Sequence, residues 1–418
     1  MQLKRVVVTG LGAISPLGNS VEEFWKNLTG GQSGAAMITR FDAAKFKTQF
    51  ACEVKGFNPE EYFENRKEVR KLDPFCHFGI AAATQAVKDS GLDGPGFDTD
   101  RIGVIWGSGI GGLQTFQEEC FAFAKGDGTP RFNPFFIPKM IADICSGHIS
   151  MRYGFRGPNF TTVSACASST NALVDAFNYI RLGKAIAIVS GGSEAAINPA
   201  GIGGFNACQA MSTRNDDPQT ASRPFDKDRD GFVLGEGGGA IILEEYEHAK
   251  ARGAKIYAEM VGGGLSADAH HITAPHPEGL GAKNVMNYAL QDAEMSAGEI
   301  DYINVHGTST PLGDVAELKA IKAVFGEHAY SMNISSTKSM TGHLLGAAGA
   351  IEAMATILAV KHDLVPPTIN HFTDDPDIDP KLNLTFHKAQ QRTVRAGLSN
   401  TFGFGGHNAS VIFRKYNG

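Results

Sequence analysis

Short runs of β-branched and other apolar residues alternate with helix-like segments along almost the whole chain, and this alternation limits the folds open to it. Several runs are apolar at every position, which indicates strands buried on both faces. The pattern predicts an α/β fold with a substantial amount of parallel sheet. We expect strands at 6–10, 101–107, 160–165, 185–191, 239–245, 255–262, 302–307, 332–337, 396–400 and 409–413.

Two patterns occur twice in the chain. A glycine turn leads into a strand at 235–243 and again at 403–413, and a strand is followed by a helix rich in small residues at 160–173 and again at 332–353. Convergent turn chemistry would explain this, but a duplicated unit explains it slightly better. We therefore predict an N-terminal half at 1–253 and a C-terminal half at 254–418. The long irregular stretches at about 115–140 and 203–231 are expected to run over the surface or into a partner subunit.

The overall composition excludes several classes of protein. The net charge is −6, which gives no positive field for nucleic acid, and no apolar stretch approaches the length of a membrane span. The six cysteines are scattered without a CxxC pair, and no signal peptide precedes the first strand, so a reduced cytoplasm is expected. TGLGAISPLG lacks the GxGxxG spacing of a dinucleotide site, and GSGIGGL (107–113) is not followed by a second strand that ends in an acidic residue about 20 positions on. His270 and His271 have no third ligand at metal spacing. We expect neither a cofactor nor a metal.

Cys166 lies where a β-rich run ends and a helical pattern begins. The helix is indicated by Leu173, Phe177 and Ile180 at i, i+4 and i+7. A cysteine at this junction faces unpaired N–H groups and the positive end of the helix dipole, which favour a thiolate. Most free cysteines are small buried hydrophobes, so the nucleophile and the core residue are about equally supported here. The other five cysteines lack this setting.

Two histidines occupy comparable positions in the second half of the chain. His306 ends an apolar run and precedes a Gly-Thr-Ser-Thr-Pro turn, after which Asp314 is expected to cap a helix through about Phe325. His343 lies between a strand and a small-residue helix. A histidine beside a glycine turn at the end of a strand is often placed for a ligand, although a core histidine is also possible.

Three further features near these histidines point to a site. Lys338 and Glu352 flank His343 among small apolar residues, where a buried charge needs a partner, so we expect the two to interact. The loop Gly403-Phe404-Gly405-Gly406, preceded by Phe402, combines backbone freedom with bulky side chains. It suits a gate with N–H groups facing an oxyanion, or equally a tight hairpin.

Four segments together resemble the β-ketoacyl-acyl-carrier-protein synthases, most closely the elongating type II condensing enzymes of bacterial fatty-acid synthesis. They are SACASS around Cys166, VHGTSTPLGD around His306, KSMTGHLLGAAGAIEA around His343 and NTFGFGG near the C-terminal end. The resemblance implies a thiolase-like αβαβα layered sandwich of two similar halves, active as a homodimer. It also implies decarboxylative condensation of an acyl group with malonyl-acyl-carrier protein.

The resemblance also assigns roles to residues. Cys166 would accept the acyl group, His306 and His343 would promote decarboxylation, and Lys338 and Glu352 would support them. The N–H groups of Cys166 and Phe404 would form the oxyanion hole, with Phe404 as the gate. Ile110 and Phe205 match positions in the acyl pocket. Further substrate contacts are expected from Phe402, Thr308, Thr310 and Thr273, and carrier-protein contacts from Lys67, Arg70, Lys71 and Arg131.

Alternatives to this reading differ in what they require of the sequence. A degradative thiolase needs a second catalytic cysteine in the C-terminal half, and none follows Cys208. A papain-like hydrolase has no use for the second histidine. The catalytic ketosynthase of a type II polyketide pathway has nearly the same motifs and stays open. His270 and His407 depart from the family pattern, which usually has tyrosine and threonine there.

Overall fold

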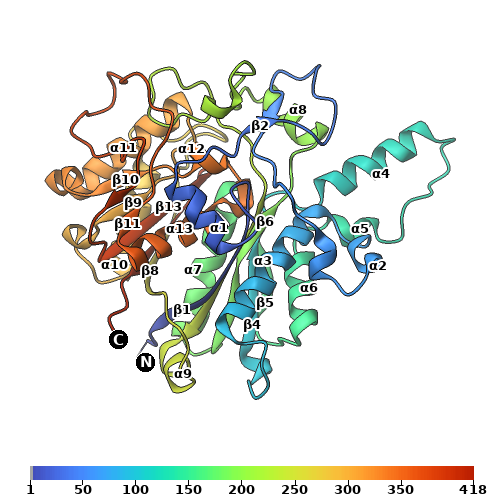
Figure 1. The fold of residues 1–418 in the computed structure, drawn as a ribbon, viewed down its shortest axis with the longest axis horizontal. Coiled ribbons are helices and arrows are strands. Elements are labelled where there is room, and N and C mark those ends of the chain that lie inside the picture. Colours follow the sequence, from blue (N-terminus) through green and yellow to red (C-terminus); the bar gives the residue numbers. More distant parts are fainter. Residues whose placement is uncertain (1–2) are drawn as a thin grey trace.

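The computed structural model describes residues 3–418 and contains one large mixed β-sheet with helices on both of its faces (Figure 1). The sheet has ten strands in the order β10-β9-β13-β14-β8-β1-β7-β6-β4-β5. Each strand coincides with one of the apolar runs that predicted it. The pairing is parallel within β5-β4-β6 and within β10-β9-β13, and antiparallel between the remaining neighbours.

The elements preceding residue 254 are β1 (Val6–Ile14), α1 (Val21–Thr29), β2 (Ala36–Met37), β3 (Phe50–Ala51), α2 (Arg66–Val69), α3 (Pro74–Ser90), β4 (Ile102–Gly107), α4 (Leu113–Lys125), α5 (Phe136–Met140), α6 (Ile144–Tyr153), β5 (Asn159–Thr162), α7 (Ser168–Arg181), β6 (Ala187–Glu194), α8 (Pro199–Ala207), β7 (Gly237–Glu245) and α9 (Tyr246–Ala251). Those that follow are β8 (Ala258–Ala267), α10 (Leu280–Asp292), β9 (Tyr302–Asn304), α11 (Pro311–Phe325), β10 (Asn333–Ser335), α12 (Lys338–Thr341), α13 (Ala348–His362), β11 (Leu364–Val365), β12 (Gln390–Gln391), β13 (Ala396–Gly403) and β14 (His407–Arg414).

The two halves of the sheet have the same topology. The first half-sheet has the order β5-β4-β6-β7-β1, and the second has the order β10-β9-β13-β14-β8. When the strands of each half are counted along the chain, both orders read third, second, fourth, fifth, first. A short antiparallel pairing of Val6–Val8 on β1 with 258–260 on β8 joins the halves. The chain is therefore built from two similar halves. The predicted boundary at 253/254 lies between α9 and β8 and stays a prediction.

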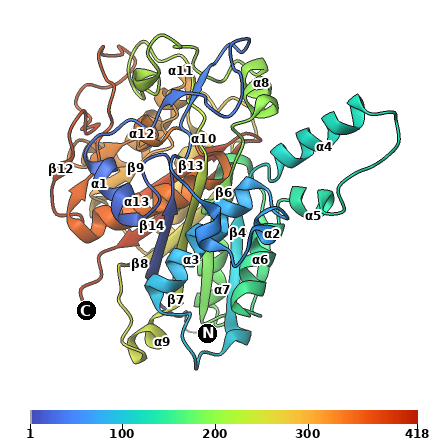
Figure 2. The same ribbon diagram turned by 45° about the vertical axis from the view of Figure 1, so that its right-hand side comes forward.

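The helices and strands form five layers, which Figures 1 and 2 show from two directions. The largest hydrophobic clusters fill the space between these layers. Helices α3 and α6 pack on the outer face of the first half-sheet, and α10 and α11 on the outer face of the second. Helices α7 and α13 lie between the half-sheets and share the central core with residues of β1, β7 and β14. This αβαβα arrangement confirms the predicted layers.

Helices α7 and α13 approach each other closely because small residues line their contact. A Cβ atom on Gly349 of α13 would stand only 2.0 Å from Oγ1 of Thr170 on α7. Ser169 Oγ of α7 also accepts a hydrogen bond from Ala350 N at 2.9 Å, which satisfies a donor in the first turn of α13. Helix α13 is buried on nearly all sides, as expected for a helix apolar around its circumference. The two helices therefore begin side by side at the centre of the molecule.

The expectation of irregular structure was wrong for the first stretch, about 115–140. Residues 113–125 and 136–140 are helices α4 and α5, which form a hairpin that projects from the body of the molecule (Figure 2). Helix α8 (199–207) overlaps only the start of the second stretch, whose remaining residues are irregular apart from a 3-10 turn at 218–220. The apolar side chains of the hairpin face outward, which removes the one-sided pattern by which a surface helix is recognised. Within residues 3–418, no helix is both long and apolar enough to cross a membrane.

Candidate active site

Cys166 lies at the predicted junction between a strand and a buried helix. Strand β5 ends at Thr162, a 3-10 turn covers Ala165–Ala167, and α7 begins at Ser168. Ala165 has φ +51°, a left-handed conformation that is costly for a residue with a side chain. This turn presents Cys166 to the central layer, where only 8 % of the residue is exposed.

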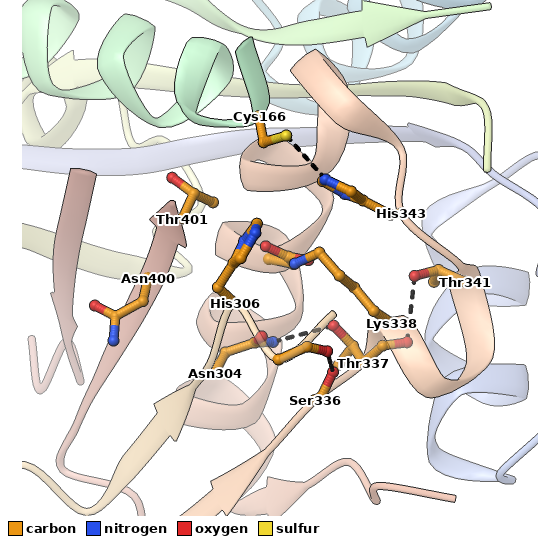
Figure 3. Close-up of polar contacts among 12 residues, drawn as sticks. Cys166, Asn304, His306, Ser336, Thr337, Lys338, Thr341, His343, Asn400 and Thr401 are labelled. Carbon is orange, nitrogen blue, oxygen red and sulfur yellow. Dashed lines mark hydrogen bonds and ion pairs between the residues drawn. The ribbon is translucent and has the colours of Figure 1, made fainter. Parts of the chain in front are cut away.

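His343 is the side chain in direct contact with the Cys166 sulfur. Its Nε2 lies 2.9 Å from Sγ, as Figure 3 shows. The backbone of His343 is fixed on both sides, since its N–H donates to Val233 O at 2.7 Å and its carbonyl accepts from Gly235 N at 2.9 Å. The contact joins the two halves of the molecule, because Cys166 belongs to the first and His343 to the second.

His306 lies two residues beyond β9 with its ring edge-on to that of His343. The ring centroids are 5.3 Å apart and the planes meet at 88°. Glu317 of α11 accepts hydrogen bonds at 2.9 Å from the backbone N–H groups of both His306 and Gly307. Helix α11 begins at Pro311, so Asp314 belongs to its first turn and is not the capping residue expected. Asp314 instead accepts from Ser309 N and Phe225 N.

Burial determines the charge of the two imidazoles. It lowers the pKa of His306 and of His343 well below the ordinary value, and the positive charge of Lys338 lowers both further. Both rings are therefore neutral near pH 7. Neither Nδ1 atom has a hydrogen-bonding partner within residues 3–418. In His343 the contact of Nε2 with the Cys166 thiol favours the tautomer that carries its proton on Nδ1.

Burial also dominates at the nucleophile. It raises the pKa of the Cys166 thiol to about 12, while Lys338 and the backbone N–H of Phe404 act in the opposite direction. The resting form is a thiol next to a neutral imidazole. The expectation that the helix N-terminus would favour a thiolate was wrong, because desolvation outweighs it in this central layer.

Lys338 and Glu352 interact as the sequence predicted. Lys338 opens α12 and Glu352 lies on α13, and their side chains form an ion pair with only 1 % and 2 % exposure. Burial raises the pKa of Glu352 to about 7, against the effect of Lys338. The pair lies behind the histidines and does not line the cavity, so it acts on the site through charge and position.

A cavity of about 680 Å³ leads to Cys166 and both histidines. The predicted substrate-contact residues all line it, namely Ile110, Phe205, Phe402, Phe404, Thr273, Thr308 and Thr310. The sequence missed Phe232, which lies edge-on to both Phe205 and His343 at ring-centroid distances of 5.4 Å. The sequence alone indicates no role for Phe232, because only the fold brings 232 next to 343.

The glycine loop after β13 is tied to a second loop at the cavity mouth. Gly405 N donates to Ile272 O at 2.7 Å, and Asp268 N donates to Gly406 O at 2.9 Å. The second loop carries His270 and Thr273, and His407 begins β14 immediately after the glycines. Phe404 is half-buried at the meeting point of the two loops.

The predicted carrier-protein patch lies on and beside α2. Lys67 and Arg70 are exposed, and the Lys71 ammonium lies 5.3 Å from the centre of the Phe135 ring, at the base of the projecting hairpin. Arg131 is on the connection between α4 and α5, where it pairs with Asp127 at 3.6 Å. The structure thus places Lys67 on α2, Arg70 and Lys71 just after it, and Arg131 on the neighbouring hairpin.

The five-layered fold, with a cysteine at the start of one central helix and two histidines from the other half, defines a thiolase-like enzyme. Two family profiles match this chain, "Beta-ketoacyl synthase, N-terminal domain" over residues 3–249 and "Beta-ketoacyl synthase, C-terminal domain" over 257–372. The chain belongs to the beta-ketoacyl synthase family.

Curated relatives share about half of their residues with this chain. It is 50% identical to the 3-oxoacyl-[acyl-carrier-protein] synthase 2 of Synechocystis sp., covering 100% of this chain and 99% of the relative. It is 49% identical to the enzyme of the same name from Vibrio harveyi, with 99% of each chain covered.

Solved structures give the same result for the fold. A beta-ketoacyl synthase from Burkholderia phymatum aligns with a TM-score of 0.91 at 36% identity, covering 99% of this chain and 100% of the other. A chain of a complex between a type II polyketide acyl-carrier protein and its ketosynthase aligns with a TM-score of 0.89 at 34% identity, covering 100% of both.

Proposed function

We propose that Cys166 carries the growing acyl chain and that His343 receives its proton. The observation that carries this proposal is the 2.9 Å contact between Nε2 and Sγ in a cavity lined by apolar side chains. As the sulfur attacks an acyl thioester, the proton passes to Nε2 and then to the departing thiol, and the acyl group remains on Cys166. The N–H groups of Cys166 and Phe404 are the proposed donors to the tetrahedral oxyanion.

The two histidines then act on the second substrate. Neutral imidazoles donate hydrogen bonds to the malonyl thioester oxygen as the bond to the carboxylate breaks and carbon dioxide leaves. Because both rings are neutral, they stabilise the enolate without supplying an acidic proton that would quench it. The enolate carbon attacks the acyl carbonyl, the bond to Sγ breaks, and the released Cys166 thiolate takes a proton from solvent. The product is two carbons longer than the acyl group.

The enzyme is a 3-oxoacyl-[acyl-carrier-protein] synthase, an acyltransferase of fatty-acid elongation that acts on acyl- and malonyl-acyl-carrier protein. Identity of 50% to a relative with that name, against 34% to the polyketide ketosynthase chain, makes the polyketide alternative the weaker one. Elongation assays with acyl-carrier-protein substrates of graded length test this assignment. A ladder of products each two carbons longer supports it, whereas exclusive use of a short starter with repeated condensation contradicts it.

We propose that the acidic carrier protein docks on α2 and the adjoining hairpin. Lys67, Arg70 and Lys71 form a local positive patch on a chain of net charge −6. Charge reversal in Lys67→Glu/Arg70→Glu should weaken carrier binding at low salt and reduce its salt dependence. Lys26→Glu/Lys381→Glu makes the same change in net charge on exposed lysines elsewhere and is the control. Equal affinity of the two variants for the carrier protein would show that the patch is not part of the docking surface.

We also propose that two copies associate through the edge of the sheet and the projecting hairpin. Strand β5 is an edge strand, and Val163 just beyond it is 60% exposed. Phe121 and Ile137 on the hairpin are 54% and 55% exposed, and such apolar surface usually lies in an interface. Sedimentation should give a dimer that Phe121→Glu/Ile137→Glu dissociates, whereas the exposed-site control Phe372→Glu should leave the dimer intact.

A cytoplasmic location remains a prediction, and cell fractionation tests it.

A further inference from the structure

Glu194 is a buried carboxylate outside the cavity, and its charge is compensated by donors alone. It is the last residue of β6 and has no measurable exposure. Its oxygens accept from Gly109 N at 2.8 Å, Gly346 N at 3.0 Å, Ile110 N and Gly111 N at 3.2 Å, and Ser108 Oγ at 3.4 Å. No lysine or arginine takes part in this group of contacts. Four converging peptide N–H groups form an anion-binding concavity that favours the ionised carboxylate. Burial nevertheless raises the pKa of Glu194 to about 7, against the effect of these hydrogen bonds.

These donors come from two segments that both reach the active site. The turn at 108–111 follows β4 and carries Ile110 into the cavity wall. Gly346 lies three residues after His343, in the 3-10 turn that opens α13. A Cβ atom on Gly346 would stand 2.2 Å from Gly109 N and 2.7 Å from Glu194 Oε2, so the two turns meet backbone to backbone around the carboxylate. Glu194 thus fastens the wall of the cavity to the turn that carries His343.

The duplicated fold gives this carboxylate a counterpart at the nucleophile. Residues 165–167 precede α7 and residues 345–347 precede α13, both as 3-10 turns whose first residues, Ala165 and Leu345, have φ of +51° and +49°. Cys166 and Gly346 are the second residues of these turns. Under the proposed function, the N–H of Cys166 faces a transient oxyanion, whereas the N–H of Gly346 donates to the resident carboxyl group of Glu194.

We propose that Glu194 is a positioning residue that fixes Ile110 and the His343 turn as one unit, so that acyl-chain fit and condensation depend on each other. This inference rests on the proposed function of Cys166 and His343. An acyl chain that presses on Ile110 moves the 108–111 turn, and the shared carboxylate transmits that movement to Gly346. Transfer of a short acyl group to Cys166 does not press on Ile110 and depends on Glu194 only through the His343 turn, so Glu194 affects it less than condensation.

The two half-reactions and chemical rescue by formate test this role. Glu194→Ala should slow condensation about 10- to 100-fold and flatten the preference among acyl lengths, since four buried donors lose their partner. Short-chain acylation of Cys166 should fall by less than about threefold. Formate at about 0.1 M should restore part of the condensation rate of Glu194→Ala by filling the same concavity, and chloride at equal ionic strength should not.

Two control variants separate this role from simple destabilisation. Glu194→Gln keeps the volume but turns an amide N–H₂ toward N–H donors, so it should lose condensation and resist rescue by formate. If Glu194→Ala does not fold, Glu194→Gln provides the test by itself, through its preference among acyl lengths and its separate rates of acylation and condensation. Ser108→Ala removes only the longest contact and should behave like the wild type with and without formate.

Two results would overturn the proposal. One is an equal loss of acylation and condensation in both Glu194 variants with an unchanged length preference, and the other is a folded Glu194→Ala enzyme that formate does not rescue. The formation of acyl-enzyme by the wild type, and its absence in Cys166→Ala, are measured in the same series. Failure of the proposed function is therefore distinguishable from failure of this inference.

Discussion

Replacing Lys338 by methionine should make stability depend on pH in a way that the wild type does not. Lys338 is the ion-pair partner of Glu352, and both are buried. Burial raises the pKa of Glu352 from 4.5 to about 7, which corresponds to a cost of about 3 kcal/mol for keeping it ionised. Because the folded-state pKa is raised, this cost is absent below pH 4.5, grows as the pH rises to about 7, and is constant above it.

In Lys338→Met the carboxyl loses its partner, its pKa rises above 7, and it stays protonated to higher pH. Near pH 6 Glu352 is already mostly protonated in the wild type. It should therefore contribute almost nothing to the stability difference between Lys338→Met and the wild type at that pH. Above about pH 7 the variant should lose up to about 1.4 kcal/mol per pH unit relative to the wild type, until Glu352 ionises. The histidines add nothing to this slope, because they are neutral throughout that range.

Denaturant unfolding between about pH 6 and pH 9 measures this slope. The double variant Lys338→Met/Glu352→Gln has no titrating group at the pair and should lose the extra slope, while remaining inactive because the charge beside the histidines is gone. Equal destabilisation of Lys338→Met at both ends of the range would refute this reasoning. The same steep slope in the double variant would also refute it.

Two other changes have clear expected results. Gly349→Ala places a Cβ 2.0 Å from Thr170 Oγ1, so it should force α7 and α13 apart and cost about 1–3 kcal/mol of stability by chemical denaturation. His306→Ala should block condensation far more than acylation of Cys166, whereas His343→Ala should slow both, because the His343 imidazole contacts the sulfur. Rapid-quench measurement of the two half-reactions checks this split, and identical profiles for the two variants would exclude separate roles.

The sequence was most informative where local pattern determines structure. The apolar runs located every strand of the main sheet, and the change from strand to helix at Cys166 located the nucleophile turn. His306 could be assigned to a turn for the same reason. Two small-residue helices also indicated the duplication, since both central helices must pack closely against other elements.

What the sequence could not give depends on contacts between distant segments. Glu194 and Glu317 carry no motif of their own, and only the fold shows that they bind the backbone beside Ile110 and His306. The thiolate expectation considered the helix N-terminus alone, because burial of Cys166 arises from packing of the two halves around it.

Intact-protein mass spectrometry during single turnover tests the central claim most directly. Incubation with an acyl-carrier protein should add one acyl mass to the enzyme, and that mass should map to Cys166. Later addition of malonyl-carrier protein should remove it and yield a 3-oxoacyl product two carbons longer. Cys166→Ala should show neither step. An acyl mass on another residue, or elongation by Cys166→Ala, would contradict the account.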